Sequence, residues 1–169
     1  YILEKNQSRK DITFIAYSFG SLVAIELTRM LEAQGFNVKL ILIDGSPAWL
    51  KTVKQQQLIS ESNDALETNI LVGIVDMLAP TMSAELFIEF KKCKSWEEKL
   101  DILLERVPGN PLGFSVENMR NMCTCLYRRL QAMDNYDVSG VSLIKAPIVL
   151  LKSMLSMVKS LPEDYGLSE

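Results

Sequence analysis

The sequence predicts an α/β fold in which a parallel sheet is interrupted by a long helical insertion. Two short apolar segments, residues 12–17 (ITFIAY) and 38–43 (VKLILI), flank an amphipathic segment that ends near Gly35. A strand, a helix and a strand within about 32 residues form a βαβ unit, which makes the two strands parallel. A third apolar segment, residues 148–151 (IVLL), comes after about a hundred residues without a convincing strand.

The segment between the first two strands is expected to form a helix over residues 20–34. Its apolar residues recur at helical spacing, and Gly35 follows where a C-terminal cap is expected. The unbroken LILI run in residues 38–43 predicts a second strand that is buried on both faces. The predicted buried face of the helix comprises Val23, Ala24, Leu27, Met30 and Leu31.

Helices are also predicted between the second and third strands. Residues 64–79 have a helical pattern, and Ser95 with Glu98 matches a capping box that opens a helix to about Arg106. An insertion of roughly 90 residues is far longer than a βα connection needs. We therefore predict a single domain over residues 1–169, with a helical lid at 50–137. A last helix follows from Val116, with this apolar face: Met119, Cys123, Leu126, Leu130 and Met133.

Composition narrows the possible functions. The chain has 169 residues, 48% of them hydrophobic, and a net charge of −3, which is typical of a globular domain. We expect no membrane span, because no apolar run approaches the ~20 residues that a span needs, and we expect a cytoplasmic location. Nucleic acid is not an expected partner, because Lys and Arg form no basic stripe. The charged groups at Lys91–Lys94 and Glu97–Lys99 are interpreted as solvated surface.

Metal and thiol chemistry are not expected either. The sequence contains no histidine and three cysteines, Cys93, Cys123 and Cys125. Without imidazole there is no histidine metal cluster, and no side chain has an ordinary pKa near 7. We expect the cysteines to be reduced apolar fillers, and we predict no metal site.

Ser18 is the candidate nucleophile. It lies in Ala16-Tyr17-Ser18-Phe19-Gly20, a small-x-Ser-x-small pattern between a predicted strand and a predicted helix. This is the context of the nucleophile elbow, whose tight turn needs small residues two positions before and after the serine. The turn holds the serine at a helix N-terminus, where a developing oxyanion is favoured.

Asp44 is the candidate acid. It directly follows the second strand, so the parallel pairing of the strands places it at the same sheet edge as Ser18. A histidine reaching between the two would complete a Ser-His-Asp triad. Asp164 is an alternative acid, because it follows the third strand.

Several motifs together resemble the thioesterase domain of animal-type fatty acid synthase. They are the AYSFG elbow, the ILIDGSP segment with its Asp44 26 residues after the serine, the helical insertion and the closing APIVLLKS…EDYGLS. The resemblance implies an α/β-hydrolase fold, with Ser18 as nucleophile, Asp44 as acid and the N–H of Phe19 as one oxyanion donor. It also implies hydrolysis of a long-chain acyl thioester carried on the phosphopantetheine of an acyl carrier protein domain of the same polypeptide, without another cofactor, in a homodimeric parent.

The helical insertion is then expected to form the lid and acyl groove. Leu71, Ile74, Val75 and Leu78 recur on one helical face that could line such a groove, although plain core packing explains the same spacing. Other possible functions are a polyketide or nonribosomal-peptide thioesterase, a carboxylesterase, and a non-catalytic acyl-binding or scaffold domain.

The chain departs from the family pattern in two ways. Ala16 stands where the family usually has Gly, and the family's catalytic histidine lies after one further strand, beyond Glu169. The loop that gives the second oxyanion N–H would lie before Tyr1. The 169-residue chain alone is therefore expected to be an inactive fragment that is prone to self-association.

Overall fold

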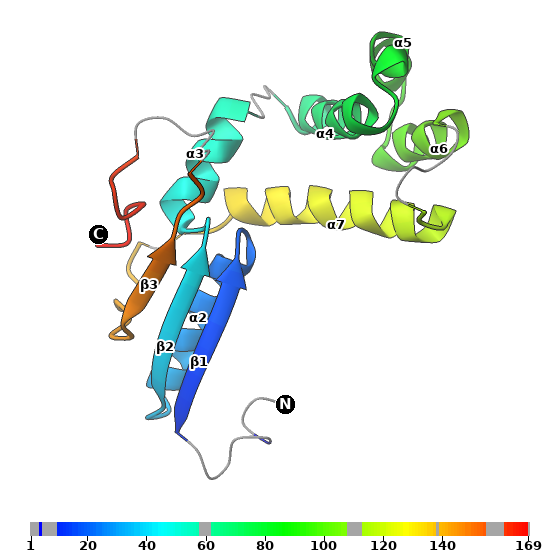
Figure 1. Cartoon of the computed structure of the whole chain (residues 1–169). Helices are drawn as coiled ribbons and strands as arrows, with labels where there is room; N and C mark the ends of the chain where they lie inside the picture. Colours follow the sequence, from blue (N-terminus) through cyan, green and yellow to red (C-terminus); the bar gives the residue numbers. More distant parts are fainter. Residues whose placement is uncertain are drawn as a thin grey trace. The chain divides into compact units, whose positions relative to one another are not determined.

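The structure is a computed structural model that describes residues 10–57, 62–107, 113–137, 139–154 and 161–168, together with Glu4. The chain divides into two compact units (Figure 1). The sheet unit comprises Tyr1–Gln56 and Tyr136–Glu169, and the helical unit comprises Gln57–Asn135. That the helical unit acts as a lid within one domain stays a prediction.

The sheet unit has the mixed α/β architecture that the sequence predicts. Three parallel strands, β1 (Asp11–Tyr17), β2 (Asn37–Ile43) and β3 (Ile148–Leu151), lie in the order β1-β2-β3. Helix α2 (Gly20–Glu32) connects β1 to β2, and α3 (Pro47–Gln57) follows β2. The three strands begin and end within one residue of their predicted bounds.

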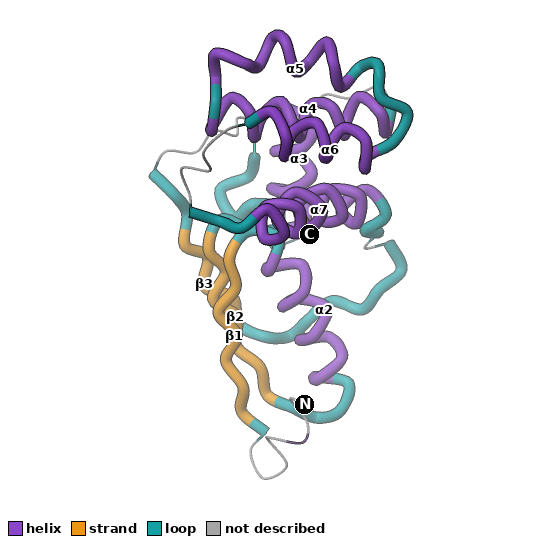
Figure 2. The backbone as a smooth tube through the Cα atoms, turned by 90° about the vertical axis from the view of Figure 1, so that its right-hand side faces the viewer, coloured by secondary structure: helices purple, strands orange, loops and turns teal. Residues whose placement is uncertain are grey.

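Helix α2 covers one face of this sheet (Figure 2). Leu40 and Leu42 of β2 point into the core beneath α2 and are fully buried. On the opposite face, Ile41 and Ile43 of β2 are only half-buried, so the prediction that β2 is buried on both faces holds for one face alone. On the outer strands β1 and β3, the side chains that share this face by strand periodicity are 49–69% exposed: Ile15, Tyr17, Val149 and Leu151.

The buried face of α2 is rotated from the predicted one. Ala24 and Leu31 are buried as predicted, but Val23 and Met30 are exposed, and Leu22 and Ile25 are buried in their place. Thr28 is also buried, and its hydroxyl donates to the carbonyl of Ala24 at 2.7 Å. A polar residue thus occupies the core side of the helix, because its own backbone satisfies the hydroxyl.

The helical unit contains α4 (Asn63–Leu78), the short 3-10 helix η1 (Pro80–Met82), α5 (Ser83–Phe90), α6 (Trp96–Arg106) and α7 (Val116–Asp134). The predicted helices α4, α6 and α7 are confirmed to within one residue. Serines cap all three, because Ser62, Ser95 and Ser115 each accept a backbone N–H of the first turn. Among the described residues, no helix is long and apolar enough to cross a membrane.

Two details of the predicted helices need correction. In the expected capping box, the Glu98 carboxylate would accept the N–H of Ser95. It accepts instead the N–H of the preceding residue, Lys94, at 2.7 Å, while the Ser95 hydroxyl accepts the N–H of Glu98 as expected. Leu126 is 40% exposed, although Met119, Cys123 and Leu130 of the same predicted face are buried.

The three cysteines are free thiols with different environments. Burial raises the pKa of Cys123 to about 11, which suits an inert core residue. Cys93 is half-buried, and Cys125 is exposed. The expectation of apolar fillers therefore describes Cys123 but not Cys125.

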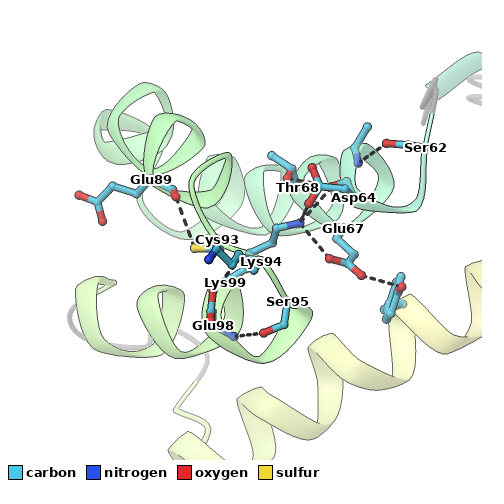
Figure 3. A network of polar contacts seen from close by, with 12 residues as sticks. Ser62, Asp64, Glu67, Thr68, Glu89, Cys93, Lys94, Ser95, Glu98 and Lys99 are labelled. Carbon is cyan, nitrogen blue, oxygen red and sulfur yellow. Dashed lines mark hydrogen bonds and ion pairs between the residues drawn. The ribbon is translucent and has the colours of Figure 1, made fainter.

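Lys99 of α6 is fully buried, which contradicts its interpretation as solvated surface. Its Nζ pairs with Oδ1 of Asp64 at 2.6 Å and with Oε2 of Glu67 at 2.8 Å, both on α4 (Figure 3). Glu67 also accepts the hydroxyl of Tyr127 on α7 at 2.8 Å, and the Tyr127 ring stacks on Trp96. The Lys99 ammonium group thus joins α6 to α4, and Glu67 extends this network to α7 through Tyr127.

The pKa values of this network follow from its contacts. Burial disfavours the charged form of Lys99, but hydrogen bonds to Asp64 and Glu67 outweigh it and raise the Lys99 pKa above its ordinary value. Burial, with the hydrogen bond to Glu67, raises the pKa of Tyr127 to about 12. The charged lysine and the neutral phenol are therefore the stable forms at neutral pH.

Replacing Lys99 should destabilise the helical unit. Lys99→Met leaves Glu67 half-buried without its cation, which should cost about 3 kcal/mol in the free energy of unfolding. Lys92→Met, at an exposed position after α5, is the matched control and should change stability by less than about 0.5 kcal/mol. Urea denaturation followed by circular dichroism measures both, and equal effects of the two variants would refute the role of Lys99.

The effect of Lys99 should also depend on pH. Because folding raises its pKa, its stabilisation is fully present below the unfolded-state pKa of about 10.4 and is lost as pH rises through the folded value. The difference between the original protein and Lys99→Met should stay constant from about pH 7 to 9 and shrink only above about pH 10, as the folded-state lysine loses its proton. Denaturation curves at these pH values test this, and a difference that grows with pH would contradict it.

Candidate active site

Ser18 lies in a strained turn between β1 and α2. Its φ is 51°, in the left-handed region that few residues other than glycine occupy. Two backbone hydrogen bonds hold this conformation: the Ser18 N–H donates to the carbonyl of Ile43 at 2.9 Å, and the Ser18 carbonyl accepts the N–H of Ser21 at 2.9 Å. A serine on a tight, strained strand-to-helix turn is the geometry expected of a nucleophile elbow.

The small residues on either side of Ser18 face each other. A Cβ added to Gly20 would lie 3.9 Å from the Cβ of Ala16, which is an ordinary van der Waals contact. Larger side chains at both positions would therefore meet across the turn. This geometry accounts for the small-x-Ser-x-small pattern and shows that Ala16 fits in place of Gly.

Asp44 occupies the equivalent position on β2. Tyr17 and Ile43 are register partners, so Ser18 and Asp44 each follow one member of a pair at the carboxyl edge of the sheet. Asp44 also has a positive φ, 43°, and its N–H donates to the carbonyl of Leu151 at 2.9 Å. The structure therefore brings the two predicted residues to one edge, on adjacent strands about 4.8 Å apart.

The Asp44 carboxylate is anchored on one oxygen. Oδ1 accepts the N–H of Ser153, in the segment after β3, at 2.6 Å. Among the described residues, no donor reaches Oδ2. A carboxylate held in this way can orient a base through its second oxygen.

Gly45 brings the two turns into contact. A Cβ at this position would lie 2.2 Å from Oγ of Ser21 and 2.5 Å from the carbonyl oxygen of Ser18, so only glycine fits. The Ser21 hydroxyl is fully buried and has no hydrogen-bond partner among the described residues. The sequence marks Gly45 only as a turn residue, and nothing local in it signals this close approach.

Asp164, the alternative acid, has a different environment. Its carboxylate accepts hydrogen bonds from the N–H groups of Gly166 and Ser168, each at 3.1 Å, and from the Ser168 hydroxyl. These bonds, chiefly the one from the Ser168 hydroxyl, lower the pKa of Asp164. Both oxygens are engaged in the residue's own turn, which favours Asp44 as the functional acid.

The remaining predicted residues divide between the two units. Phe19 directly precedes α2 with φ −54° and ψ −30°, so its N–H lies at the helix N-terminus. Leu71, Ile74 and Val75 are at most 4% exposed, and Leu78 packs against the same core of the helical unit. This placement favours core packing over the predicted acyl groove, because these side chains contact other helices.

The sequence has no histidine, and the part of the chain that the structure describes contains no cluster of three His, Cys, Asp or Glu residues suited to a metal ion. Comparisons with known family models and with curated proteins find no match to the chain.

The close contact at Gly45 predicts that alanine is destabilising at Gly45 but tolerated at Gly20. Gly45→Ala should destabilise the protein by about 1–3 kcal/mol, because the new methyl group would overlap Ser18 and Ser21. Gly20→Ala places its methyl group in ordinary contact with Ala16 and should change stability by less than about 0.5 kcal/mol. Thermal or urea denaturation of both variants tests the contact, and a harmless Gly45→Ala would disprove it.

Proposed function

We propose that this chain carries the nucleophile and the acid of a serine thioesterase with an α/β-hydrolase fold. The observation that carries the proposal is Ser18, held at positive φ on a strand-turn-helix, with Asp44 at the same sheet edge. The proposed reaction is hydrolysis of a long-chain acyl thioester on the phosphopantetheine of an acyl carrier protein. The choice of substrate rests on the resemblance of the AYSFG and ILIDGSP segments to the fatty acid synthase thioesterase domain.

The proposed chemistry proceeds through an acyl-serine. Oγ of Ser18 attacks the thioester carbonyl carbon while its proton passes to a base; the C–S bond then breaks, and the thiol leaves with that proton. Water attacks the acyl-serine in the second step and releases the fatty acid and Ser18. The N–H of Phe19 would donate to the oxyanion.

In this proposal the base is a histidine from outside these 169 residues, because they contain none. The resemblance implies a histidine on a loop after a further strand, and Asp44 Oδ2 is the oxygen that would orient it. An acyl carrier domain on the same polypeptide, a homodimeric parent and a cytoplasmic location are parts of the same proposal.

A non-catalytic acyl-binding domain is the second candidate. The lack of histidine favours it, because no other side chain has an ordinary pKa near 7 to accept the Ser18 proton. A polyketide or peptide thioesterase, or a carboxylesterase, would differ in the acyl group that is accepted. Acyl-CoA substrates of increasing chain length separate these possibilities, and a preference near sixteen carbons favours release of a fatty acid.

Substitutions in the full-length protein that contains this chain test the proposal. Ser18→Ala should lower the kcat for palmitoyl-CoA by about 10⁶-fold, and Asp44→Asn by about 10⁴-fold. Asp164→Asn should cost far less than either, at most about 100-fold, because its carboxylate holds the turn around it and contacts neither Ser18 nor Asp44. Full activity of Ser18→Ala would refute the proposed nucleophile, and a larger loss with Asp164→Asn than with Asp44→Asn would exchange the two acids.

The 169-residue chain alone should hydrolyse palmitoyl-CoA no faster than buffer does. Loss of the triad histidine costs about 10⁶-fold in turnover in a serine protease. Steady-state assays of the purified chain check this expectation. Hydrolysis that Ser18→Ala abolishes would show that another group in the chain serves as the base.

A further inference from the structure

We infer that the C-terminal segment 161–168, here the 161–168 turn, positions Asp44, and that Ser46 and Tyr165 are positioning residues for the proposed reaction. The inference rests on the proposed function of Ser18 and Asp44. It comes from a set of contacts that join the turn to the loop after Asp44 and to the first residues of α3.

Ser46 is the central link. Its side chain is fully buried two residues after Asp44. The hydroxyl donates to the carbonyl of Tyr165 at 2.7 Å and accepts the N–H of Trp49 at 2.9 Å. One hydroxyl thus caps the first turn of α3 and ties the loop after Asp44 to a segment 119 residues later.

Tyr165 and its neighbour pack closely against α3. The Tyr165 ring is buried and stacks on Trp49, with 6.1 Å between ring centroids and 19° between planes. A Cβ added to Gly166 would lie 3.1 Å from the Cβ of Ala48, so the backbone of the turn lies against the helix. Tyr165 has a φ of 56°, a strained conformation that the surrounding contacts must hold.

A second set of contacts comes from the segment after β3. Nζ of Lys152 donates to the carbonyl of Glu163 at 2.9 Å and lies 5.9 Å from the Tyr165 ring. The next residue, Ser153, donates its N–H to the Asp44 carboxylate. The turn therefore contacts both segments that hold Asp44: the one that follows it in sequence and the one that binds its side chain.

This double anchoring matters because Asp44 lies in a loop and must orient a base with sub-ångström precision. A displacement of about 1 Å in a catalytic group can cost about 100-fold in rate. The loop backbone also touches the nucleophile turn through Gly45, so movement of the loop would disturb Ser18 as well. Breaking the tie at Ser46 should thus reduce turnover more than substrate binding.

The test uses the full-length protein and measures kcat per active site, with sites titrated by a fluorophosphonate that labels Ser18. Ser46→Ala should lower the kcat for palmitoyl-CoA by about 10- to 100-fold and leave KM within about twofold. Gly166→Ala is a second variant that keeps the Ser46 side chain: it strains a backbone with a φ of 70° and crowds Ala48, so it disturbs the turn. It should lower kcat in the same way, and it tests the inference even if Ser46→Ala does not fold.

Thr28→Val is the matched control. It removes a buried hydroxyl that also donates to a backbone carbonyl in the sheet unit, but Thr28 lies at the other end of α2 from Ser18. It should lower the melting temperature without changing kcat per titrated site. If Thr28→Val lowers kcat as much as Ser46→Ala does, both variants act through general destabilisation, and the inference is overturned.

Two further outcomes separate the inference from the proposed function. Ser46→Ala and Gly166→Ala with unchanged kcat, or with only KM raised, would overturn the positioning role while Ser18-dependent hydrolysis stood. No Ser18-dependent hydrolysis by the unsubstituted full-length protein would overturn both.

Discussion

Parallel pairing of β1 with β2 determines where the two side chains of the candidate site lie. The register that opposes Tyr17 and Ile43 brings the next residue of each strand, Ser18 and Asp44, to one edge. The hydrogen bond from the Ser18 N–H to the Ile43 carbonyl extends that pairing into the turn. A slip of one residue would turn the side chains of one strand to the opposite face of the sheet. The burial of Leu40 and Leu42 beneath α2 opposes such a slip, so core packing and the site share one constraint.

The strands and the longer helices could be predicted because their signals are local. A short apolar run indicates each strand, and serine caps mark the beginnings of α6 and α7. Helix α5 was not predicted, because eight residues are too few for a periodicity to emerge. Helix α3 was also missed, although Ser46 followed by Pro47 is a helix-start signal that could have revealed it.

Much of the candidate site lies outside what local patterns can reveal. Ser18 and Asp44 follow from the topology of one βαβ unit, whereas the Ser153 amide that binds Asp44 is 109 residues away in sequence. The predicted exposure of Lys99 is wrong for the same reason. Its charge indicates a solvated side chain, but its carboxylate partners lie on α4, 32 and 35 residues earlier in the sequence. Polar contacts between residues so far apart produce no periodic pattern in the sequence. The sequence therefore predicts the residues at the strand ends but not the distant groups that bind their side chains.

Backbone strain is concentrated around the candidate site. Within the described ranges, the residues other than glycine with positive φ are Ser18, Asp44 and Tyr165. A glycine would adopt each conformation with little strain, and an ordinary side chain there costs on the order of 1 kcal/mol or more. The local backbone conformation alone would therefore favour glycine at all three positions, least strongly at Asp44, because aspartate tolerates the left-handed region. The fold instead keeps a hydroxyl, a carboxylate and an aromatic ring there, so contacts from elsewhere in the sheet unit must offset the strain: the Ile43 carbonyl at Ser18, the Ser153 amide at Asp44 and the Trp49 ring at Tyr165.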